Sequence, residues 1–387
     1  MNDTLTLTDE KVLAEARETL AEHLQLQAEG YKCQTRDLMN VLLAVATDQG
    51  TIESVCSDLP GLPNAETMRQ HINEELCVAE LPQLQQALNH AMAQGLPPRL
   101  WRRAQDIAID FHDRPYYGKK PQEKALWVQG RAKDGATRFY RIASAYILMN
   151  NLRFTLAVCF VLPEHSTVDV LRCLLDQVRR LRLQVRRLLL DRGFAGVAVQ
   201  SFLEKEGIPA LIACPIRGKK NGTRALCRGR RSYRAQHTFK AADGQTRTAE
   251  IAVCRVFTTA KRTGRLRRRA AWHLFILINL QMTPVQVRRL YRRRFGVETS
   301  YRCAAQVRGW TTSPNPAYRF FLMALGLLLV NVWLSLRWRF TQRARRGGRW
   351  LDTRIFRLSR FAKFILRALQ RRYDSVHQIT ATVPPLL

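Results

Sequence analysis

Three carboxylates are candidates for chemistry because each is isolated among apolar or basic residues. Asp110 lies inside the apolar strand pattern IAIDF, where a charged carboxylate is costly unless it is paired or binds a cation. Asp191 ends the apolar run LLLD. Glu298 is the only acid between Glu250 and Asp352. Because carboxylate oxygens are ligands for hard divalent cations, these acids form a candidate site for Mg²⁺ or Mn²⁺.

The chemistry that fits such a site is phosphoryl transfer. Two divalent ions about 4 Å apart can activate an attacking oxygen and stabilise the leaving oxygen of a phosphodiester. Asp191 follows a strand, and the carboxyl ends of strands are where α/β sheets present ligand-binding groups. Along the first strand, Asp110 and His112 share a face while Asp113 points away, which favours Asp110 over Asp113.

Each acid also has a purely structural interpretation. Asp110 could pair with an arginine in the core, with Asp113 as the working acid instead. The sole role of Asp191 could be to cap a turn, and the sole role of Glu298 could be to pair with a basic residue of its own helix. Taken singly, these interpretations are as good as catalysis, so the case depends on the three acids together.

The spacing of residues before Glu298 resembles the signature of a known family. Tyr291, Arg294 and Glu298 match the first part of the Y-x2-R-x3-E-x6-K signature of DDE transposases of bacterial and archaeal insertion sequences, of the insertion-sequence-four superfamily. The lysine position falls on Ala305, and Arg302 and Arg308 are nearby residues that could supply the phosphate contact. The segments IAIDFHDRPYYGKK and LLLDRGFAGVAVQSFLEKEGIP also resemble those that carry the first and second acids.

The resemblance covers about residues 100–340 and implies an activity. It implies an enzyme that binds the terminal inverted repeats of its own mobile element, hydrolyses a phosphodiester there, and joins the exposed 3′-hydroxyl to target DNA. Two Mg²⁺ or Mn²⁺ ions would be held by Asp110, Asp191 and Glu298, with Tyr291 and Arg294 in support. The enzyme is expected to act on DNA as a homodimer.

The elements that must position these acids alternate between strand and helix patterns. Period-two or short apolar runs predict strands, and runs of period 3.6 predict helices. Strands are predicted at 104–113, twice within 137–162, and at 185–191, 208–214 and 273–280. Helices are predicted at 166–181 with Ser166 or Thr167 as the cap, at 195–207, and from a Thr283 cap through Glu298. Three strands followed by alternating helix and strand predict an α/β fold, a ribonuclease-H-like mixed sheet flanked by helices.

Composition shifts predict the domain organisation. The predicted parts are an N-terminal helical domain at 1–98, a catalytic domain at 99–214 and 271–340, a β-rich basic insertion at 215–270, and a basic helical tail at 341–387. Within the first part, a helix starting after Asn64 follows another across a Gly/Pro turn, the outline of a helix-turn-helix. Arg69, Gln70 and Asn73 would then face a DNA groove. The acidity of this segment leaves a plain helical or dimerisation domain as an equal alternative.

The charge of the chain points to a polyanionic partner. The chain carries 63 Lys and Arg against 31 Asp and Glu, a net charge of +32, and nucleic acid is the usual neutralising partner. The insertion at 215–270 holds 17 basic residues against two acidic ones. The candidate DNA-binding residues are Lys219, Lys220, Arg230, Arg231, Lys261, Arg262, Arg267 and Arg268.

Other features bear on location and on competing functions. Nine cysteines without a C-x-x-C pair indicate reduced thiols, and with a polar N-terminus they predict a cytoplasmic, nucleoid-associated protein. The apolar stretch 320–336 is short for a membrane span, so we expect a buried core helix and no membrane. The open alternatives are a nuclease of the same fold that does not join strands, a non-catalytic DNA-binding remnant, and a membrane protein that uses 320–336.

Overall fold

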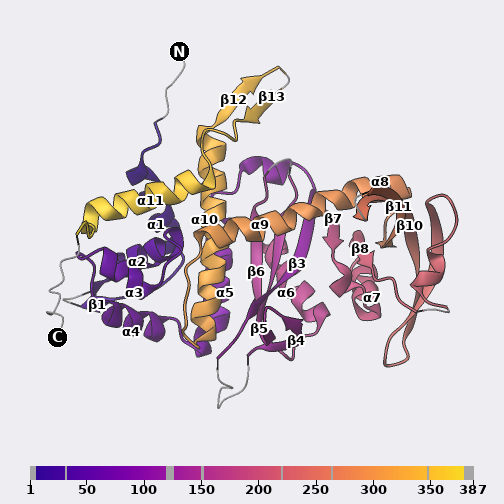
Figure 1. Ribbon diagram of the computed structural model, residues 1–387, viewed down its shortest axis with the longest axis horizontal. Helices are drawn as coiled ribbons and strands as arrows, with labels where there is room; N and C mark the ends of the chain where they lie inside the picture. The colour runs from indigo at the N-terminus through magenta and orange to yellow at the C-terminus, as the bar shows by residue number, and fades with distance from the viewer. Residues whose placement is uncertain are drawn as a thin grey trace. The chain divides into compact units, whose positions relative to one another are not determined.

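In the computed structural model the chain forms two compact units (Figure 1). One unit comprises Met1–Pro97 with Ser300–Leu387, and the other comprises Pro98–Thr299. The structure describes residues 6–30, 33–118, 126–149, 152–218, 221–262, 265–346 and 348–378. Within these ranges it does not describe the side chains of residues 29, 258–262, 265–268, 295–299, 344–345 and 348–350.

The unit Pro98–Thr299 is built on a nine-stranded mixed sheet. Its strands follow the short helix η2 (Pro98–Arg102) and are β3 (Gln105–Pro115), β4 (Val128–Lys133), β5 (Ala136–Ile147), β6 (Thr155–Val161), β7 (Val185–Leu190), β8 (Ala210–Cys214), β9 (Tyr233–Lys240), β10 (Thr246–Arg262) and β11 (Arg265–Ile278). The strand order is β4-β5-β3-β7-β8-β11-β10-β9, with β6 also paired to β5.

The centre of this sheet confirms the predicted fold class. In the order β6-β5-β3-β7-β8, strand β5 is antiparallel to both β6 and β3, whereas β3, β7 and β8 run parallel. Parallel neighbours need crossover connections, and helices α6 (Thr167–Arg180) and α7 (Val197–Lys205) supply them. Helix α6 starts at the predicted cap Ser166 and packs its apolar side against β5 and β6. A mixed sheet flanked by helices is the ribonuclease-H-like arrangement expected from the element order.

Strands β9 to β11 extend the sheet beyond β8 in an antiparallel arrangement. They include much of the stretch 215–270 that was predicted to be basic and β-rich, and the short helix η4 (Thr223–Leu226) lies in the part of it that precedes them. Strands β4 and β9 were not predicted from the sequence. Strand β9 alternates between partly buried and exposed residues, but its partly buried positions include His237 and Tyr233, so its apolar signal is weak.

The helix predicted to run from Thr283 through Glu298 is interrupted, which corrects the sequence-based interpretation. Thr283 caps α8 (Pro284–Tyr291) as predicted, but a 3₁₀ turn, η5 (Arg292–Phe295), follows before α9 (Gly296–Ala304). Glycine is a poor helix former, and the η5 arginines bind strand β3, so the backbone tightens locally. Tyr291, Arg294 and Glu298 therefore do not share one continuous helix.

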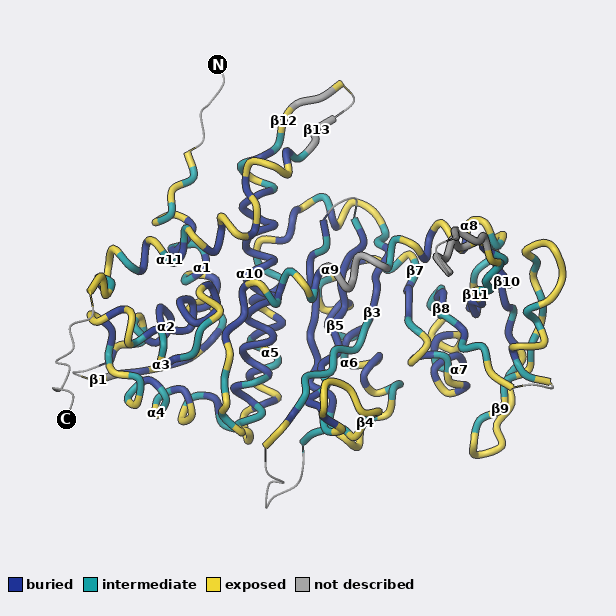
Figure 2. The backbone as a smooth tube through the Cα atoms, in the orientation of Figure 1, coloured by how far each residue is buried: buried dark blue, intermediate teal, exposed yellow. Residues whose placement is uncertain are grey.

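The other unit is helical and is centred on α10 (Pro316–Phe340). The accompanying elements are α1 (Asp9–Ala21), β1 (Glu29–Gly30), β2 (Cys33–Gln34), α2 (Thr35–Thr47), α3 (Ile52–Asp58), α4 (Ala65–Glu75), η1 (Val78–Glu80), α5 (Leu81–Ala93), η6 (Ala305–Val307), β12 (Gln342–Arg345), β13 (Gly348–Leu351) and α11 (Leu358–Tyr373). Helix α10 is long and apolar enough to cross a membrane, yet 89% of its most apolar window is buried within the protein (Figure 2). This burial matches the expected core helix.

Acidic and basic ends of the chain pair inside the helical unit. Helix α11 packs against α1, and Arg371 bonds Asp9 at 2.8 Å and Glu10 at 3.3 Å. Arg339 at the end of α10 pairs with Glu15. The acidic residues of α1 and the basic residues of α10 and α11 thus partly neutralise each other within this unit. All nine cysteines, scattered over both units, are free thiols as expected.

Candidate active site

Two of the predicted acids lie side by side where the parallel pairing of β3 with β7 ends. Strands β3 and β7 pair in register through Ile109 and Leu190, so Asp110 and Asp191 each lie one residue past that pair. The apolar residues before each acid are buried between the layers and fix both strands in the core. Parallel strands lie about 4.8 Å apart, so in-register neighbours present their side chains side by side.

The electrostatics of Asp110 identify it as an unusual carboxylate. Burial raises its pKa to about 6, Arg294 opposes this increase, and the charge of Asp191 adds to it. The Arg294 guanidinium donates a hydrogen bond to Asp110 Oδ1 at 2.7 Å, and both side chains are less than one-fifth exposed. A buried carboxylate whose pKa is raised partly by a second carboxylate is a position where a cation would stabilise both charges.

Asp191 is held at the strand end by a local turn. It caps the 3₁₀ turn η3 (Arg192–Phe194), and its Oδ1 accepts a 2.7 Å hydrogen bond from the Gly193 amide. One oxygen is therefore used by the backbone, and this bond orients the carboxylate. The capping role was the structural alternative for Asp191, and the structure shows that it coexists with a position beside Asp110.

Tyr291 and Arg294 support the two aspartates from α8 and η5. The Tyr291 hydroxyl donates to the carbonyl oxygen of Leu190 at 3.2 Å. The Arg294 guanidinium lies 5.8 Å from the centre of the Tyr291 ring. These contacts connect two residues of the predicted signature to the strands that carry the first two acids. The predicted core pairing of Asp110 with an arginine is real, and its partner belongs to the signature.

Asp113 has a different environment. It faces Arg141 across the β3–β5 pair and accepts two hydrogen bonds from that guanidinium, at 2.6 and 2.9 Å. The two side chains are 30% exposed, and the Arg141 guanidinium also lies 5.4 Å from the centre of the Phe111 ring. Because successive strand residues alternate faces, Asp113 lies on the face opposite Asp110, as the sequence predicted.

The third predicted acid, Glu298, lies in α9, but its side chain is outside the described residues. Among the side chains that the structure describes, no three His, Cys, Asp or Glu residues group closely enough to hold a metal ion. Asp110 and Asp191 nonetheless offer the hard oxygen donors that Mg²⁺ or Mn²⁺ prefers. Arg302, the other predicted supporting residue, is exposed on α9 and belongs to the unit that contains Ser300–Leu387.

A family model for the transposase DDE domain matches residues 101–331, which is more than half of the chain. The chain belongs to the DDE transposase domain family. It is therefore a transposase, an enzyme of DNA recombination, and members of this family generally use divalent metal ions. The match includes β3, β7 and α9, the three elements that carry the predicted acids.

Comparison with solved structures agrees on the fold. The transposase is similar to the piggyBac transposase in its synaptic complex with hairpin DNA, with a TM-score of 0.53 and 12% sequence identity. The alignment covers 95% of this chain and 80% of that one. At this identity the likeness shows the fold alone. The comparison with curated proteins found no match.

The predicted DNA-binding residues of the transposase are only partly described. Arg230 and Arg231 are exposed in the segment before β9, and their contact with DNA stays a prediction. Lys219 and Lys220 lie outside the described residues. Four others lie on β10 and β11 with side chains that the structure does not describe: Lys261, Arg262, Arg267 and Arg268.

Sequence reasoning missed an aromatic and basic cluster on the same strands. The Arg255 guanidinium lies 5.0 Å from the centre of the Phe257 ring and 6.0 Å from that of Trp272. Phe257 is 49% exposed, and Arg255 is directly opposite Trp272 in the β10–β11 pair. The i, i+2 spacing of Arg255 and Phe257 was the available signal, because it places both side chains on one face of a strand.

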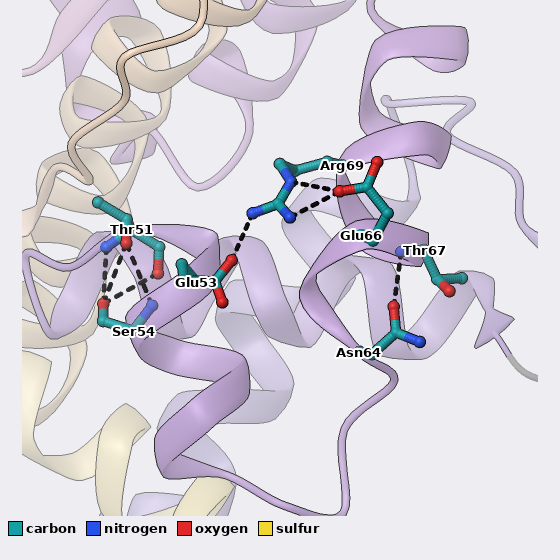
Figure 3. A network of polar contacts seen from close by, with 7 residues as sticks. All are labelled: Thr51, Glu53, Ser54, Asn64, Glu66, Thr67 and Arg69. Carbon is teal, nitrogen blue, oxygen red and sulfur yellow. Dashed lines mark hydrogen bonds and ion pairs between the residues drawn. The ribbon is translucent and has the colours of Figure 1, made fainter.

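The helix-turn-helix candidate α3–α4 uses its polar side chains internally (Figure 3). Arg69 bonds Glu53 of α3 at 2.5 Å and Glu66 of α4 at 2.6 Å, so two carboxylates neutralise it. Gln70 and Asn73 also form hydrogen bonds within this unit. Asn64 caps α4 as predicted. These contacts favour the plain helical interpretation, and DNA reading by α4 stays a prediction.

Proposed function

We propose that this transposase hydrolyses phosphodiesters at the ends of an insertion sequence of the insertion-sequence-four type and joins the ends to target DNA. The observation that carries the proposal is the pair Asp110 and Asp191 on adjacent parallel strands, with the pKa of Asp110 raised by burial and by its neighbour. A DNA end bearing the element's inverted repeat would be the first substrate, and target DNA the second.

Asp110, Asp191 and Glu298 are proposed to hold two Mg²⁺ or Mn²⁺ ions. When bound, such ions activate an attacking oxygen and stabilise a leaving one. Asp110 must be deprotonated to bind, and Arg294 favours that state because its guanidinium donates to the carboxylate. Asp191 has one oxygen fixed by the Gly193 amide, which leaves the other oxygen to face the reaction.

The proposed reaction has two displacements at phosphorus. In the first, water forms a new bond to phosphorus, the bond to the 3′-oxygen breaks, and that oxygen takes a proton to become a free 3′-hydroxyl. In the second, this hydroxyl attacks a phosphodiester of the target, and the target's own 3′-oxygen leaves with a proton. Both steps proceed without a covalent bond between protein and DNA, so the acids would act by holding the metal ions in position.

The test uses duplex DNA that carries the inverted repeats flanking this coding region, with Mg²⁺ and a circular target plasmid. Cleavage at the repeat end with joining to the plasmid supports the proposal. Cleavage without joined products would support the alternative of a nuclease of the same fold. DNA binding with no cleavage in either Mg²⁺ or Mn²⁺ would support a non-catalytic remnant, in which the change to Ala305 accompanies lost activity.

The proposed partners and location follow from the same activity. Joining two ends of one element requires two active sites, so a homodimer on DNA is the expected assembly. The net charge of +32 suits a protein that works on the nucleoid in the cytoplasm. Molecular mass measured by light scattering, with and without the inverted-repeat DNA, tests the dimer.

A further inference from the structure

Asp106, at the start of β3, is a buried acid outside the proposed chemistry. Its side chain has no solvent exposure and pairs with Arg186, Arg187 and Arg293. Burial alone would raise the pKa of Asp106, but hydrogen bonds from Arg186 and Arg187 outweigh it and hold the pKa below its usual value. One ionised carboxylate thus pairs with three arginines, which is more positive charge than its own neutralisation requires.

A β-bulge explains how two consecutive arginines reach the same carboxylate. In a regular strand Arg186 and Arg187 would point to opposite faces. The β3–β7 register shifts between Gln105 and Asp106, which leaves Arg186 as the extra residue of β7. Both guanidiniums then make two hydrogen bonds to Asp106, between 2.5 and 3.0 Å long.

The third arginine comes from a different element, the turn η5. Arg293 donates to Asp106 at 2.9 Å and also to the carbonyl oxygen of Leu148 at 2.6 Å. The next residue, Arg294, donates to Asp110 at 2.7 Å. Asp106 and Asp110 share a face of β3 and are four residues apart, about 13 Å along a strand. Consecutive arginines therefore fasten η5 to β3 at two separate points.

We propose that Asp106 is a positioning residue that acts through Arg293 to hold the turn η5 at a fixed position along β3. The fixed position of η5 keeps Arg294 bonded to Asp110 and sets where α9 begins, at Gly296. The catalytic consequence rests on the proposed function, because α9 carries Glu298. The pair of Arg293 with the fully buried Asp106 supplies the anchor, and the pair of Arg294 with Asp110 stays available for the chemistry.

The three arginines provide a matched pair of variants. Arg293→Met and Arg186→Met each remove one positive charge and one ion pair with Asp106, at side chains that are 38% and 50% exposed. In both variants two arginines still neutralise Asp106. Only Arg293→Met releases η5. Arg293→Lys keeps the charge but cannot reach Asp106 and Leu148 with a planar fork, so its effect should be intermediate.

The first measurement is amide hydrogen exchange on the full chain without metal or DNA. We expect Arg293→Met to speed exchange in residues 292–299 at least tenfold relative to Arg186→Met, with β3 and β7 unchanged. Equal exchange in the two variants would overturn the proposal. If Arg293→Met fails to fold, the comparison is made with Arg293→Lys, and faster exchange in residues 292–299 remains the expected result.

The second measurement is the Mg²⁺ concentration that gives half-maximal cleavage. We expect it to rise at least threefold in Arg293→Met and to stay constant in Arg186→Met, whereas a general loss of stability would lower activity without moving it. If wild type cleaves and the two variants show equal midpoints, the positioning role in catalysis is wrong while the proposed function stands. If wild type does not cleave, the proposed function fails, and hydrogen exchange still decides whether Asp106 holds η5.

Discussion

The Tyr291 hydroxyl donates a 3.2 Å hydrogen bond to the carbonyl oxygen of Leu190, the last residue of β7. Burial raises the pKa of Tyr291 to about 12, so the hydroxyl keeps its proton and remains a donor at neutral pH. Because Asp191 follows Leu190 directly, this bond fixes the backbone that presents the second acid. The tyrosine of the signature is thereby linked to an acid that is 100 residues away in the sequence.

Tyr291→Phe should slow DNA cleavage about tenfold through a looser strand end, by an energy on the order of one neutral hydrogen bond. The ring would still pack against Phe275, whose centre is 4.7 Å away, so the fold should persist with about 1 kcal/mol less stability. Cleavage rates at saturating DNA and urea unfolding measure the two effects. An unchanged rate, or a loss of DNA affinity in place of rate, would show that Tyr291 does not act through Asp191.

The pKa of Asp110 predicts how pH affects stability without metal. Its folded value is about 6 against a usual value of 3.8, so the folded state prefers the protonated form. The resulting stabilisation is complete below about pH 4 and is lost as the pH rises through about 6. Asp110→Asn should therefore gain stability relative to wild type between these pH values, by up to about 3 kcal/mol.

Urea unfolding of both proteins from about pH 4 to about pH 8, without divalent metal, measures this difference. Protons should also compete with Mg²⁺, so the Mg²⁺ affinity of wild type should fall as the pH decreases below about 6. Asp113→Asn serves as the control, since Asp113 is paired with Arg141 on the opposite face. Parallel stability curves for wild type and Asp110→Asn would contradict the assignment of a buried, destabilised carboxylate.

Much of the site could be predicted because its strands are strongly apolar. The apolar runs before Asp110 and Asp191 indicate buried strands, so a carboxylate that interrupts or ends such a run indicates a special role. The mixed sheet was predicted from the order of its elements, but the pairing of β3 with β7 was not, because β4, β5, β6 and α6 separate these strands in the chain. The juxtaposition of the two acids was expected from the family resemblance of the segments that carry them.

The break in the helix before Glu298 could not be predicted in the same way. Its cause is tertiary, because Arg293 and Arg294 bind acids about 185 residues earlier in the chain. Helix propensity alone favours continuing α8 through a run of arginines. Asp106 was also missed, since its three partners come from a bulge and a turn that no local pattern announces. Arg69 was predicted to face a DNA groove, but it forms ion pairs with two carboxylates.

Replacing Arg230 and Arg231 together by alanine should lower the affinity for DNA, and by the same factor for different DNA sequences. Exposed arginines act on phosphates, so the slope of log affinity against log salt should decrease by about 2. Arg371→Ala is the control, because this arginine is paired with Asp9 and Glu10 and should change the slope little. Fluorescence anisotropy between about 50 and 200 mM salt makes the measurement. Equal slopes for the double variant and wild type would remove these arginines from the DNA-binding surface.

Glu298→Gln should abolish cleavage while leaving DNA binding intact. The amide keeps the size of the side chain but loses the charge that is proposed to hold a metal ion, so the Mg²⁺-dependent rate should fall by several orders of magnitude. DNA affinity should stay the same or rise slightly, because one carboxylate near the phosphates is gone. The matched control is Asp113→Asn, the same acid-to-amide change at the pair with Arg141, and it should retain most of the activity. Rates of end cleavage and binding isotherms on the same inverted-repeat DNA separate the two effects. An inactive Asp113→Asn beside an active Glu298→Gln would mean that the active site uses a different third acid, even though the family is right.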